Sequence, residues 1–292
     1  MFNEELITAK VAARNAGKIL MKYFKSSDKK VQMKSKDNPV TIADNEADSY
    51  LNNFIISEFP DDGWLSEETV DTSDRLNKNR VWIVDPLDGT KEFIEGIENF
   101  SISIALVNNN SPVVGVIFNP ATNEMFSCQK NKGVYLNGKK VNISSQKKIK
   151  QSSILVSRSE LKRGEWEPYR NSFKSIQPIG SVAYKLAMVS AGNSDTFATV
   201  APKNEWDICA GDCLVNEAGG VMRTINDKKI IYNQKNTLVT DTIIASNSVL
   251  FNLSTCLLSC FKFSMYSLNL SNGSMLSTVL NWLCMTFLIY KG

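Results

Sequence analysis

The chain has 292 residues, 43% hydrophobic and 22% charged, values typical of a globular protein with one large domain or two modest ones. Its net charge of +3, with no block of lysines and arginines, argues against nucleic-acid or membrane-surface binding. The absence of histidine excludes Ser-His-Asp and Cys-His catalysis, so that a general base has to be Asp, Glu, Lys, Tyr or a water molecule.

The N-terminal region predicts two amphipathic helices. Asn3 can cap the first, which runs to about Phe24 with apolar residues at spacings of three and four. Thr41 can cap the second, which ends near Phe59 and carries Asp44 in its first turn. The N-terminus has no basic and apolar segments of a signal peptide, so we expect a cytoplasmic protein.

An apolar run starting at Val81 stops abruptly in Asp85-Pro86-Leu87-Asp88-Gly89-Thr90. The run predicts a buried strand, which Pro86 ends because proline has no N–H to donate to a sheet. Two carboxylates at the end of a core strand repel each other unless a cation joins them, and hard oxygen ligands suit Mg²⁺. Asp-Pro and Asp-Gly are also ordinary turn signals, so the hexapeptide alone leaves a plain turn open.

Beyond this motif, the sequence predicts an N-terminal half, residues 1–150, that ends in an antiparallel meander. Its strands are Ser101–Val107, Val113–Phe118, Glu124–Cys128 and Gly133–Leu136. In the second half, residues 151–254, strands alternate with helices, which indicates an α/β arrangement. The predicted elements there are Ile154–Val156, a helix over Val182–Ala191 capped by Ser181, Asp195–Val200, a helix over Trp206–Ala218, and a final strand, Val221–Thr224.

Residues 255–292 form an atypical apolar tail. They contain two lysines and no acid, and residues 275–290 are nearly all apolar or small. This segment is shorter than the ~20 residues that a bilayer span needs. An extra core helix, a membrane anchor and a non-native tail from a change of reading frame remain as interpretations; we favour the non-native tail and treat membrane attachment as the weaker alternative.

Three further acids resemble the Asp85/Asp88 pair because each lies at the end of an apolar segment: Asp44, Glu67 and Asp207. Taken singly, each has an ordinary explanation. Asp44 can complement a helix dipole, Glu67 can be a surface charge, and Asp207 can cap a helix.

Together these segments resemble the inositol monophosphatase-like family of Mg²⁺-dependent, lithium-sensitive phosphatases. The first signature is Trp82-Ile-Val-Asp-Pro-Leu-Asp-Gly-Thr90, and the second is Glu205-Trp-Asp-Ile-Cys-Ala-Gly211 followed by Glu217-Ala-Gly-Gly220. Pro39-Val-Thr-Ile-Ala-Asp44 matches the upstream Val-Thr-x-Ala-Asp element. Ser66-Glu-Glu68 occupies the Gly-Glu-Glu element, with serine in place of glycine. The resemblance extends from the first helix to about residue 250.

The resemblance implies a mixed α+β and α/β chain in a layered αβαβα sugar-phosphatase fold with a multi-Mg²⁺ site. It implies that Glu67, Asp85 and the Leu87 carbonyl hold one ion, that Asp85, Asp88 and Asp207 hold a second, and that Glu67 with a water can hold a third. Thr90 hydrogen-bonded to Asp44 would orient the attacking water and take its proton. The implied catalytic residues are therefore Asp44, Glu67 and Thr90.

Within the family, Thr90-Lys91-Glu92-Phe93 resembles the 3'(2'),5'-bisphosphate nucleotidase branch, and we expect removal of the 3'-phosphate of adenosine 3',5'-bisphosphate. An inositol monophosphatase, a histidinol-phosphate phosphatase and an inactive metal- or nucleotide-binding relative are the alternatives. The candidate substrate-binding residues are Gly89, Thr90, Gly180, Ser181, Lys203, Glu205 and Asp207. The implied partner is a small phosphorylated substrate, and the implied assembly is a monomer or homodimer.

Overall fold

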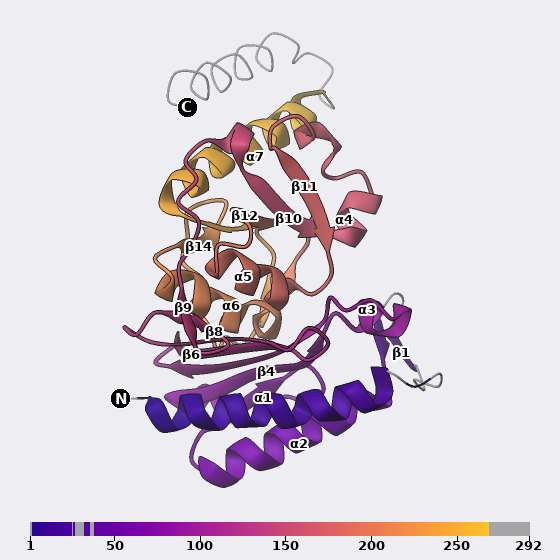
Figure 1. Cartoon of the computed structure of the whole chain (residues 1–292), viewed down its shortest axis with the longest axis vertical. Helices are drawn as coiled ribbons and strands as arrows, with labels where there is room; N and C mark the ends of the chain where they lie inside the picture. Colours follow the sequence, from indigo (N-terminus) through magenta and orange to yellow (C-terminus); the bar gives the residue numbers. More distant parts are fainter. Residues whose placement is uncertain (1, 25, 27–31, 36–37, 269–292) are drawn as a thin grey trace.

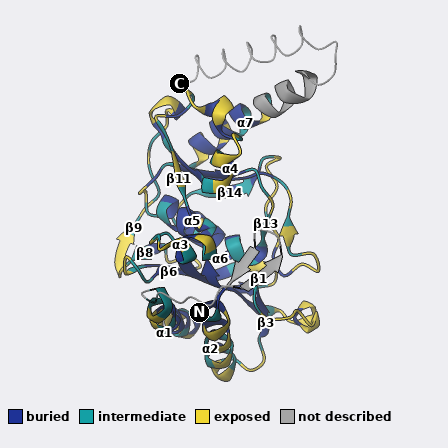
Figure 2. Cartoon of the chain, turned by 90° about the vertical axis from the view of Figure 1, so that its right-hand side faces the viewer, coloured by how far each residue is buried: buried dark blue, intermediate teal, exposed yellow. Residues whose placement is uncertain are grey.

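Helices and sheets alternate in five layers along the long axis of the molecule (Figure 1). The computed structural model describes residues 2–24, 26, 32–35 and 38–268. The order of the layers is helix, sheet, helix, sheet, helix, which confirms the predicted αβαβα arrangement. Buried residues line the inner faces of the helices and both faces of the sheets (Figure 2).

The first layer consists of α1 (Asn3–Phe24) and α2 (Ile42–Glu58), as predicted. Small and aliphatic residues of both helices pack on one face of the large sheet. Thr41 caps α2, because its hydroxyl accepts a hydrogen bond from the Ala43 N–H while Asp44 accepts one from the Thr41 N–H. The cap fixes Asp44 in the first turn of α2, with its side chain directed into the protein.

The second layer is a seven-stranded sheet. In sheet order its strands are β3 (Gly63–Ser66), β4 (Arg80–Asp88), β5 (Ser101–Asn108), β6 (Ser111–Asn119), β7 (Glu124–Gln129), β8 (Val134–Leu136) and β9 (Lys139–Val141). Only the β3–β4 pair is parallel. Alternate residues of β4 belong to different cores, with Val81 and Ile83 on one side and Trp82 and Val84 on the other, which explains the continuous apolar run in the sequence.

The remaining three layers belong to the second half of the chain. Helices α5 (Val182–Ser190) and α6 (Glu205–Glu217) lie between the two sheets. The smaller sheet has the order β11 (Ser175–Ile179), β10 (Ser153–Ser157), β12 (Thr196–Thr199), β16 (Ile243–Ser246), β14 (Val221–Thr224). Helices α4 (Arg158–Lys162) and α7 (Ser248–Leu268) form the outer layer. Short elements complete the chain: β1 (Gln32–Ser35), β2 (Asn38–Val40), α3 (Thr90–Glu95), β13 (Lys203–Asn204) and β15 (Leu238–Val239).

One prediction about the second half was wrong in detail, and one strand was missed. The strand Val221–Thr224 is β14, but it is not the final strand, because β16 follows it and is inserted between β12 and β14. Strand β11 was missed because its sequence, SIQPI, is polar, includes a proline and lies at the sheet edge.

The predicted boundary between residues 254 and 255 falls inside α7. Leu253, Leu257 and Leu258 on this helix pack in the core under the smaller sheet, as expected for an extra core helix in this portion of the tail. The membrane-anchor and non-native interpretations were made for the whole of residues 255–292, of which residues 269–292 lie outside the described residues. Within the described part of the chain, no helix combines the length and apolarity that a membrane crossing requires.

Candidate active site

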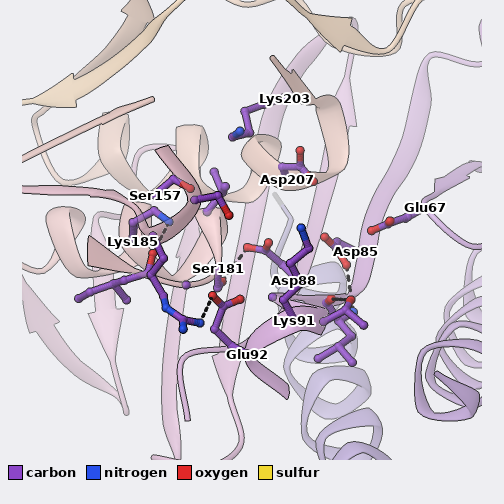
Figure 3. A pocket seen from close by; sticks show the side chains of 18 residues that line it. Glu67, Asp85, Asp88, Lys91, Glu92, Ser157, Ser181, Lys185, Lys203 and Asp207 are labelled. Carbon is purple, nitrogen blue, oxygen red and sulfur yellow. Dashed lines mark hydrogen bonds and ion pairs between the residues drawn. The ribbon is translucent and has the colours of Figure 1, made fainter. Parts of the chain in front are cut away.

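A cleft of about 330 Å³ opens where β4 ends, between the two halves of the chain (Figure 3). Ten of the predicted site residues line it: Glu67, Asp85, Leu87, Asp88, Gly89, Thr90, Gly180, Ser181, Lys203 and Asp207. Asp44 lies behind the cleft wall, in contact with Thr90, whereas Glu205 is elsewhere.

The parallel pairing of β3 and β4 brings Glu67 and Asp85 together. Ser66 is paired with Val84, and the carboxyl ends of parallel strands lie at the same sheet edge. The residue that follows each of them is an acid, so the two carboxylates emerge side by side although they are 18 positions apart in the sequence.

An irregularity in β4 exposes the second part of the motif to the cleft. Between Asp85 and Asp88 the pairing with β5 shifts, which is the signature of a β-bulge. The Leu87 N–H donates to Asp85 Oδ1 at 2.9 Å, which closes a tight turn around Pro86. Gly89 then has φ of +98°, and a Cβ there would lie 3.0 Å from the Asn99 carbonyl oxygen, so this position requires glycine.

Glu67, Asp85 and Asp207 form an acidic cluster that can hold a metal ion. One carboxylate oxygen from each lies within 4.8 Å of the others. Burial, with repulsion from the neighbouring carboxylates, raises the pKa of Asp85 well above its usual range. Burial and the nearby Asp88 charge raise the pKa of Asp207 to about 7. Three carboxylates converging within 4.8 Å form an oxygen-only donor set, which fits a hard divalent cation such as Mg²⁺.

Asp88 lies beside this cluster but is directed toward α5. Its Oδ2 accepts hydrogen bonds at 2.6 Å from the Ser181 hydroxyl and from the Ala183 N–H. Ser181 caps α5 and has φ of +55°, an unusual value for serine. Gly180 precedes it in close contact with Glu92, because a Cβ at Gly180 would lie 2.2 Å from the Glu92 Cγ.

Thr90 and Asp44 form the predicted pair. The Thr90 hydroxyl is 3.2 Å from Asp44 Oδ1 and 3.1 Å from the Leu87 carbonyl oxygen. The other Asp44 oxygen accepts from the backbone and the hydroxyl of Thr41. Burial raises the pKa of Asp44 to about 6, which keeps it ionised at neutral pH but basic enough to receive a proton.

The structure does not bring Glu205 into the cleft. Its side chain is buried and accepts hydrogen bonds from the Asn233 and Gln234 N–H groups at 2.6 and 2.9 Å. The substrate-binding role predicted for it is therefore not supported by its position. The reason is that Glu205 is the first residue of α6 and points away from Asp207, two positions later.

Sequence reasoning missed most of the cationic wall of the cleft. Lys91, Arg158 and Lys185 line it together with the predicted Lys203. Lys185 is 2% exposed, donates to the Ile179 carbonyl oxygen at 2.8 Å, and has its pKa lowered to about 8 by burial. A single charge within the apolar α5 sequence VAYKLAMVS was the signal that could have identified it.

Comparison with known proteins places this geometry in context. A model of the inositol monophosphatase family matches residues 3–259. Inositol monophosphatase 1 of Solanum lycopersicum is 33% identical over 221 residues, which cover 72% of this chain and 81% of that protein. A fructose-1,6-bisphosphatase/inositol-1-monophosphatase of Thermotoga maritima is 32% identical over 233 residues, 79% of this chain and 89% of that protein. The solved structure of a Thermotoga maritima IMPase superposes with a TM-score of 0.77 at 30% identity and covers 86% of this chain and 95% of that one.

Proposed function

Because the chain belongs to the inositol monophosphatase family of phosphatases, we propose that it hydrolyses a small phosphate monoester with Mg²⁺, and that an inositol monophosphate is the first candidate substrate. The proposal rests on one observation: the same cleft holds the carboxylates of Glu67, Asp85 and Asp207 and the hydroxyl of Thr90, which contacts Asp44. The names of the similar proteins favour inositol monophosphate over the bisphosphate nucleotide expected from Lys91-Glu92-Phe93.

The donor set supports the assignment of a metal. Glu67, Asp85 and Asp207 would hold the cation, with the Leu87 carbonyl and Asp88 at its edge. When bound, divalent cations neutralise the phosphate, lower the pKa of a water and stabilise the leaving oxygen. Without such a charge the three neighbouring carboxylates repel each other, and this repulsion favours a bound cation.

Thr90 and Asp44 would orient and deprotonate the attacking water. The Thr90 hydroxyl donates its single hydrogen toward Asp44, so its oxygen keeps a lone pair that can accept a hydrogen from a water in the cleft. Asp44 then receives the proton through Thr90. This arrangement supplies a general base in a chain without histidine.

The backbone of Gly89 and Thr90 would support the phosphate. Both residues line the cleft immediately after the bulge that carries the metal-binding carboxylates. The absence of a Cβ at Gly89 lets the chain turn tightly, so that the phosphate can approach the backbone closely. On the opposite side, the hydrogen bonds that Asp88 accepts from Ser181 and Ala183 would hold α5 against the substrate.

A second candidate is the 3'-phosphate of adenosine 3',5'-bisphosphate. The observation that favours it is that three lysines, Lys91, Lys185 and Lys203, line the cleft, more cations than a substrate with one phosphate needs in addition to the metal. The fourth cation of the wall, Arg158, is paired with Glu92 and Glu95 at 2.8 and 2.7 Å. Lys185 is the most buried of these at 2% exposed, and the nearby Asp88 and Glu92 carboxylates favour its charged form, so its ammonium keeps a charge that a second phosphate can contact.

A phosphate-release assay with inositol 1-phosphate, adenosine 3',5'-bisphosphate and histidinol phosphate, with and without Mg²⁺, tests these proposals. We expect Mg²⁺-dependent release, highest from inositol 1-phosphate, and none from an Asp207→Asn variant. Lys185→Met separates the two candidates, because it should reduce bisphosphate hydrolysis more than inositol phosphate hydrolysis. Binding of these compounds without Mg²⁺-dependent release from any of them would reject the enzyme and support an inactive relative.

A further inference from the structure

The acidic cluster depends on both halves of the chain. Glu67 follows β3 of the large sheet, whereas Asp207 is on α6 in the middle layer. Strand pairing fixes Glu67 next to Asp85, but no strand pairing relates Glu67 to Asp207. Among the described residues, the Ser103 hydroxyl on β5 donates to the Trp206 carbonyl oxygen at 3.2 Å, which joins the start of α6 to the strand beside Asp85. The segment that follows Glu67 makes a second set of polar contacts, which connects Glu67 with the start of α6.

The near end of this segment is fixed by Asp48 on α2. Asp48 is 6% exposed, and its two carboxylate oxygens accept hydrogen bonds from the residues that flank Glu67 and Glu68. The Ser66 hydroxyl donates to one oxygen at 2.5 Å, and the Thr69 hydroxyl donates to the other at 2.6 Å. The serine that replaces the glycine of the family element therefore has a structural role in this chain.

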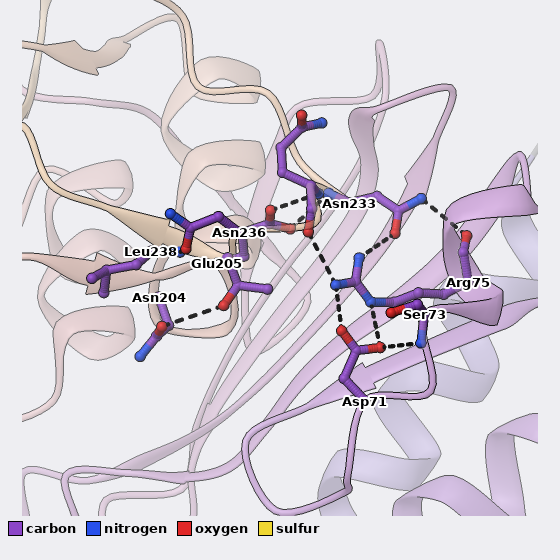
Figure 4. Close-up of polar contacts among 10 residues, drawn as sticks. Asp71, Ser73, Arg75, Asn204, Glu205, Asn233, Asn236 and Leu238 are labelled. Atoms are coloured by element: carbon purple, nitrogen blue, oxygen red, sulfur yellow. Dashed lines mark hydrogen bonds and ion pairs between the residues drawn. The ribbon is translucent and has the colours of Figure 1, made fainter.

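The far end is fixed by Arg75, which crosses to the second half of the chain (Figure 4). Its guanidinium donates to Asn233 Oδ1 at 2.6 Å, to the Gln234 carbonyl oxygen at 3.0 Å and to both carboxylate oxygens of Asp71. In return, the Asn233 side-chain amide donates to the Arg75 carbonyl oxygen at 3.1 Å. Arg75 is 3% exposed, so its planar fork of donors is held in one orientation by neighbours on both sides.

The contacts continue from Asn233 to the start of α6. The Asn233 and Gln234 N–H groups both donate to the Glu205 carboxylate. Glu205 is the first residue of α6, and Asp207 in the same turn accepts from the Asn204 N–H at 2.8 Å. A short rigid turn thus separates the last contact of the network from the third carboxylate of the cluster.

We propose that the Arg75 bridge, defined as Arg75, Asn233, Gln234 and Glu205, is a positioning device that sets the separation of Glu67 and Asp207 and thereby the affinity for the divalent cation. The inference rests on the proposed metal-binding function of the cluster. A metal site requires its ligand atoms to be placed to within a few tenths of an ångström of their ideal positions. Residues that do not touch the metal but orient its ligands therefore tune the metal affinity. None of the bridge residues lines the cleft, so the bridge acts through the two carboxylates.

Calorimetric titration with Mg²⁺ alone, on the full chain without substrate, tests the proposal. Asn233→Ala removes the side-chain contacts with Arg75 but keeps the backbone N–H to Glu205, and we expect the Mg²⁺ dissociation constant to rise about tenfold. Arg75→Ala should weaken binding further, and Arg75→Lys should be intermediate. In each case kcat should recover at saturating Mg²⁺, since the catalytic groups are intact.

Asn247→Ala is the matched control. Asn247 also joins distant segments, because its side chain donates to the Ser144 and Gln146 carbonyl oxygens and accepts from the first turn of α7. Loss of this side chain should lower the melting temperature but leave Mg²⁺ affinity unchanged. If general destabilisation were enough to weaken Mg²⁺ binding, Asn247→Ala would weaken it as well.

The possible failures are distinguishable. If the wild-type chain binds Mg²⁺ and Asn233→Ala binds it equally well, or if Asn247→Ala weakens binding as much, the positioning role is wrong while the proposed function stands. If the wild-type chain neither binds Mg²⁺ nor releases phosphate, the proposed function itself is wrong. Asn233→Ala decides the question even if Arg75→Ala does not fold.

Discussion

Replacing Asp85 by asparagine should stabilise the metal-free protein while removing its response to Mg²⁺. Asp85 is 1% exposed and lies within 4.8 Å of carboxylate oxygens from Glu67 and Asp207. At an effective dielectric constant of about 20, two unit charges at that distance repel by about 3.5 kcal/mol. Asparagine has nearly the same shape, can still accept the hydrogen bond from the Leu87 N–H, and presents an amide donor to its acidic neighbours.

Partial protonation already relieves some of this repulsion in the metal-free protein, so the expected gain in unfolding free energy is smaller, about 2 kcal/mol. The size of this gain depends on pH. The pKa values of Asp85 and Asp207 are raised by folding, so the folded protein retains protons that the unfolded chain releases, and stability falls as the pH rises through these values. The gain should therefore be largest at pH 8, where it corresponds to about 4–8 °C in melting temperature.

Thermal unfolding at pH 8, with chelator or with Mg²⁺, measures both effects. A cation at 100 times its dissociation constant adds about 2.7 kcal/mol to the wild type and nothing to a chain that cannot bind it. The two proteins should consequently exchange rank when Mg²⁺ is added. Asp195→Asn is the control, because Asp195 accepts hydrogen bonds from Ser153 and Ser144 away from the cluster, and its variant should be less stable but still respond to Mg²⁺. A metal-free Asp85→Asn protein that melts below the wild type, or one that Mg²⁺ still stabilises, would refute the reasoning.

Three other outcomes are expected. Because burial raises the pKa of Asp44 to about 6 and only its ionised form accepts a proton, kcat/KM should fall as the pH drops below about 6; an unchanged rate at pH 5 would contradict the role of this carboxylate. Ser66→Gly removes a hydrogen bond to Asp48 and should raise the Mg²⁺ dissociation constant about three- to tenfold by calorimetry, whereas equal affinity would show that this contact does not position the site. Gly180→Ala should cost about 1–3 kcal/mol in denaturant unfolding, because its Cβ would lie 2.2 Å from the Glu92 Cγ. Adding Glu92→Ala should restore much of that loss, and strictly additive effects would argue against the contact.

Local signals predicted the elements that local interactions determine. The cap at Thr41 and the aliphatic periodicity located α2, and the apolar run ending in Pro86 located β4. The meander from Ser101 to Leu136 followed from alternating strands and turn residues. In each case the residues that decide the structure lie within a few positions of one another, so the sequence alone contains the information.

Features that depend on contacts between distant parts of the chain were harder to predict from the sequence. Nothing near Ile243 indicates that β16 is inserted between two earlier strands, because that order is decided by packing of the whole sheet. The direction of Glu205 could not be predicted either, since it depends on the loop at Asn233, 28 positions away. Lys185 was visible as a charge in an apolar helix, but its place in the cleft follows from how α5 docks on the large sheet.

The resemblance to a known family named the acidic residues, and the structure shows why a cation held by all of them would depend on the docked chain. The first half carries Glu67, Asp85 and Asp88, and the second half carries Asp207 together with the groups that hold Asp88. Neither half alone contains the three clustered carboxylates. A cation that requires all three therefore binds only when α6 is docked on the large sheet, so its binding free energy adds to the stability of the interface between the halves. When the cation is absent, the repulsion among the carboxylates lowers the stability of the same interface. The one cluster would therefore destabilise the metal-free fold and stabilise the metal-bound fold.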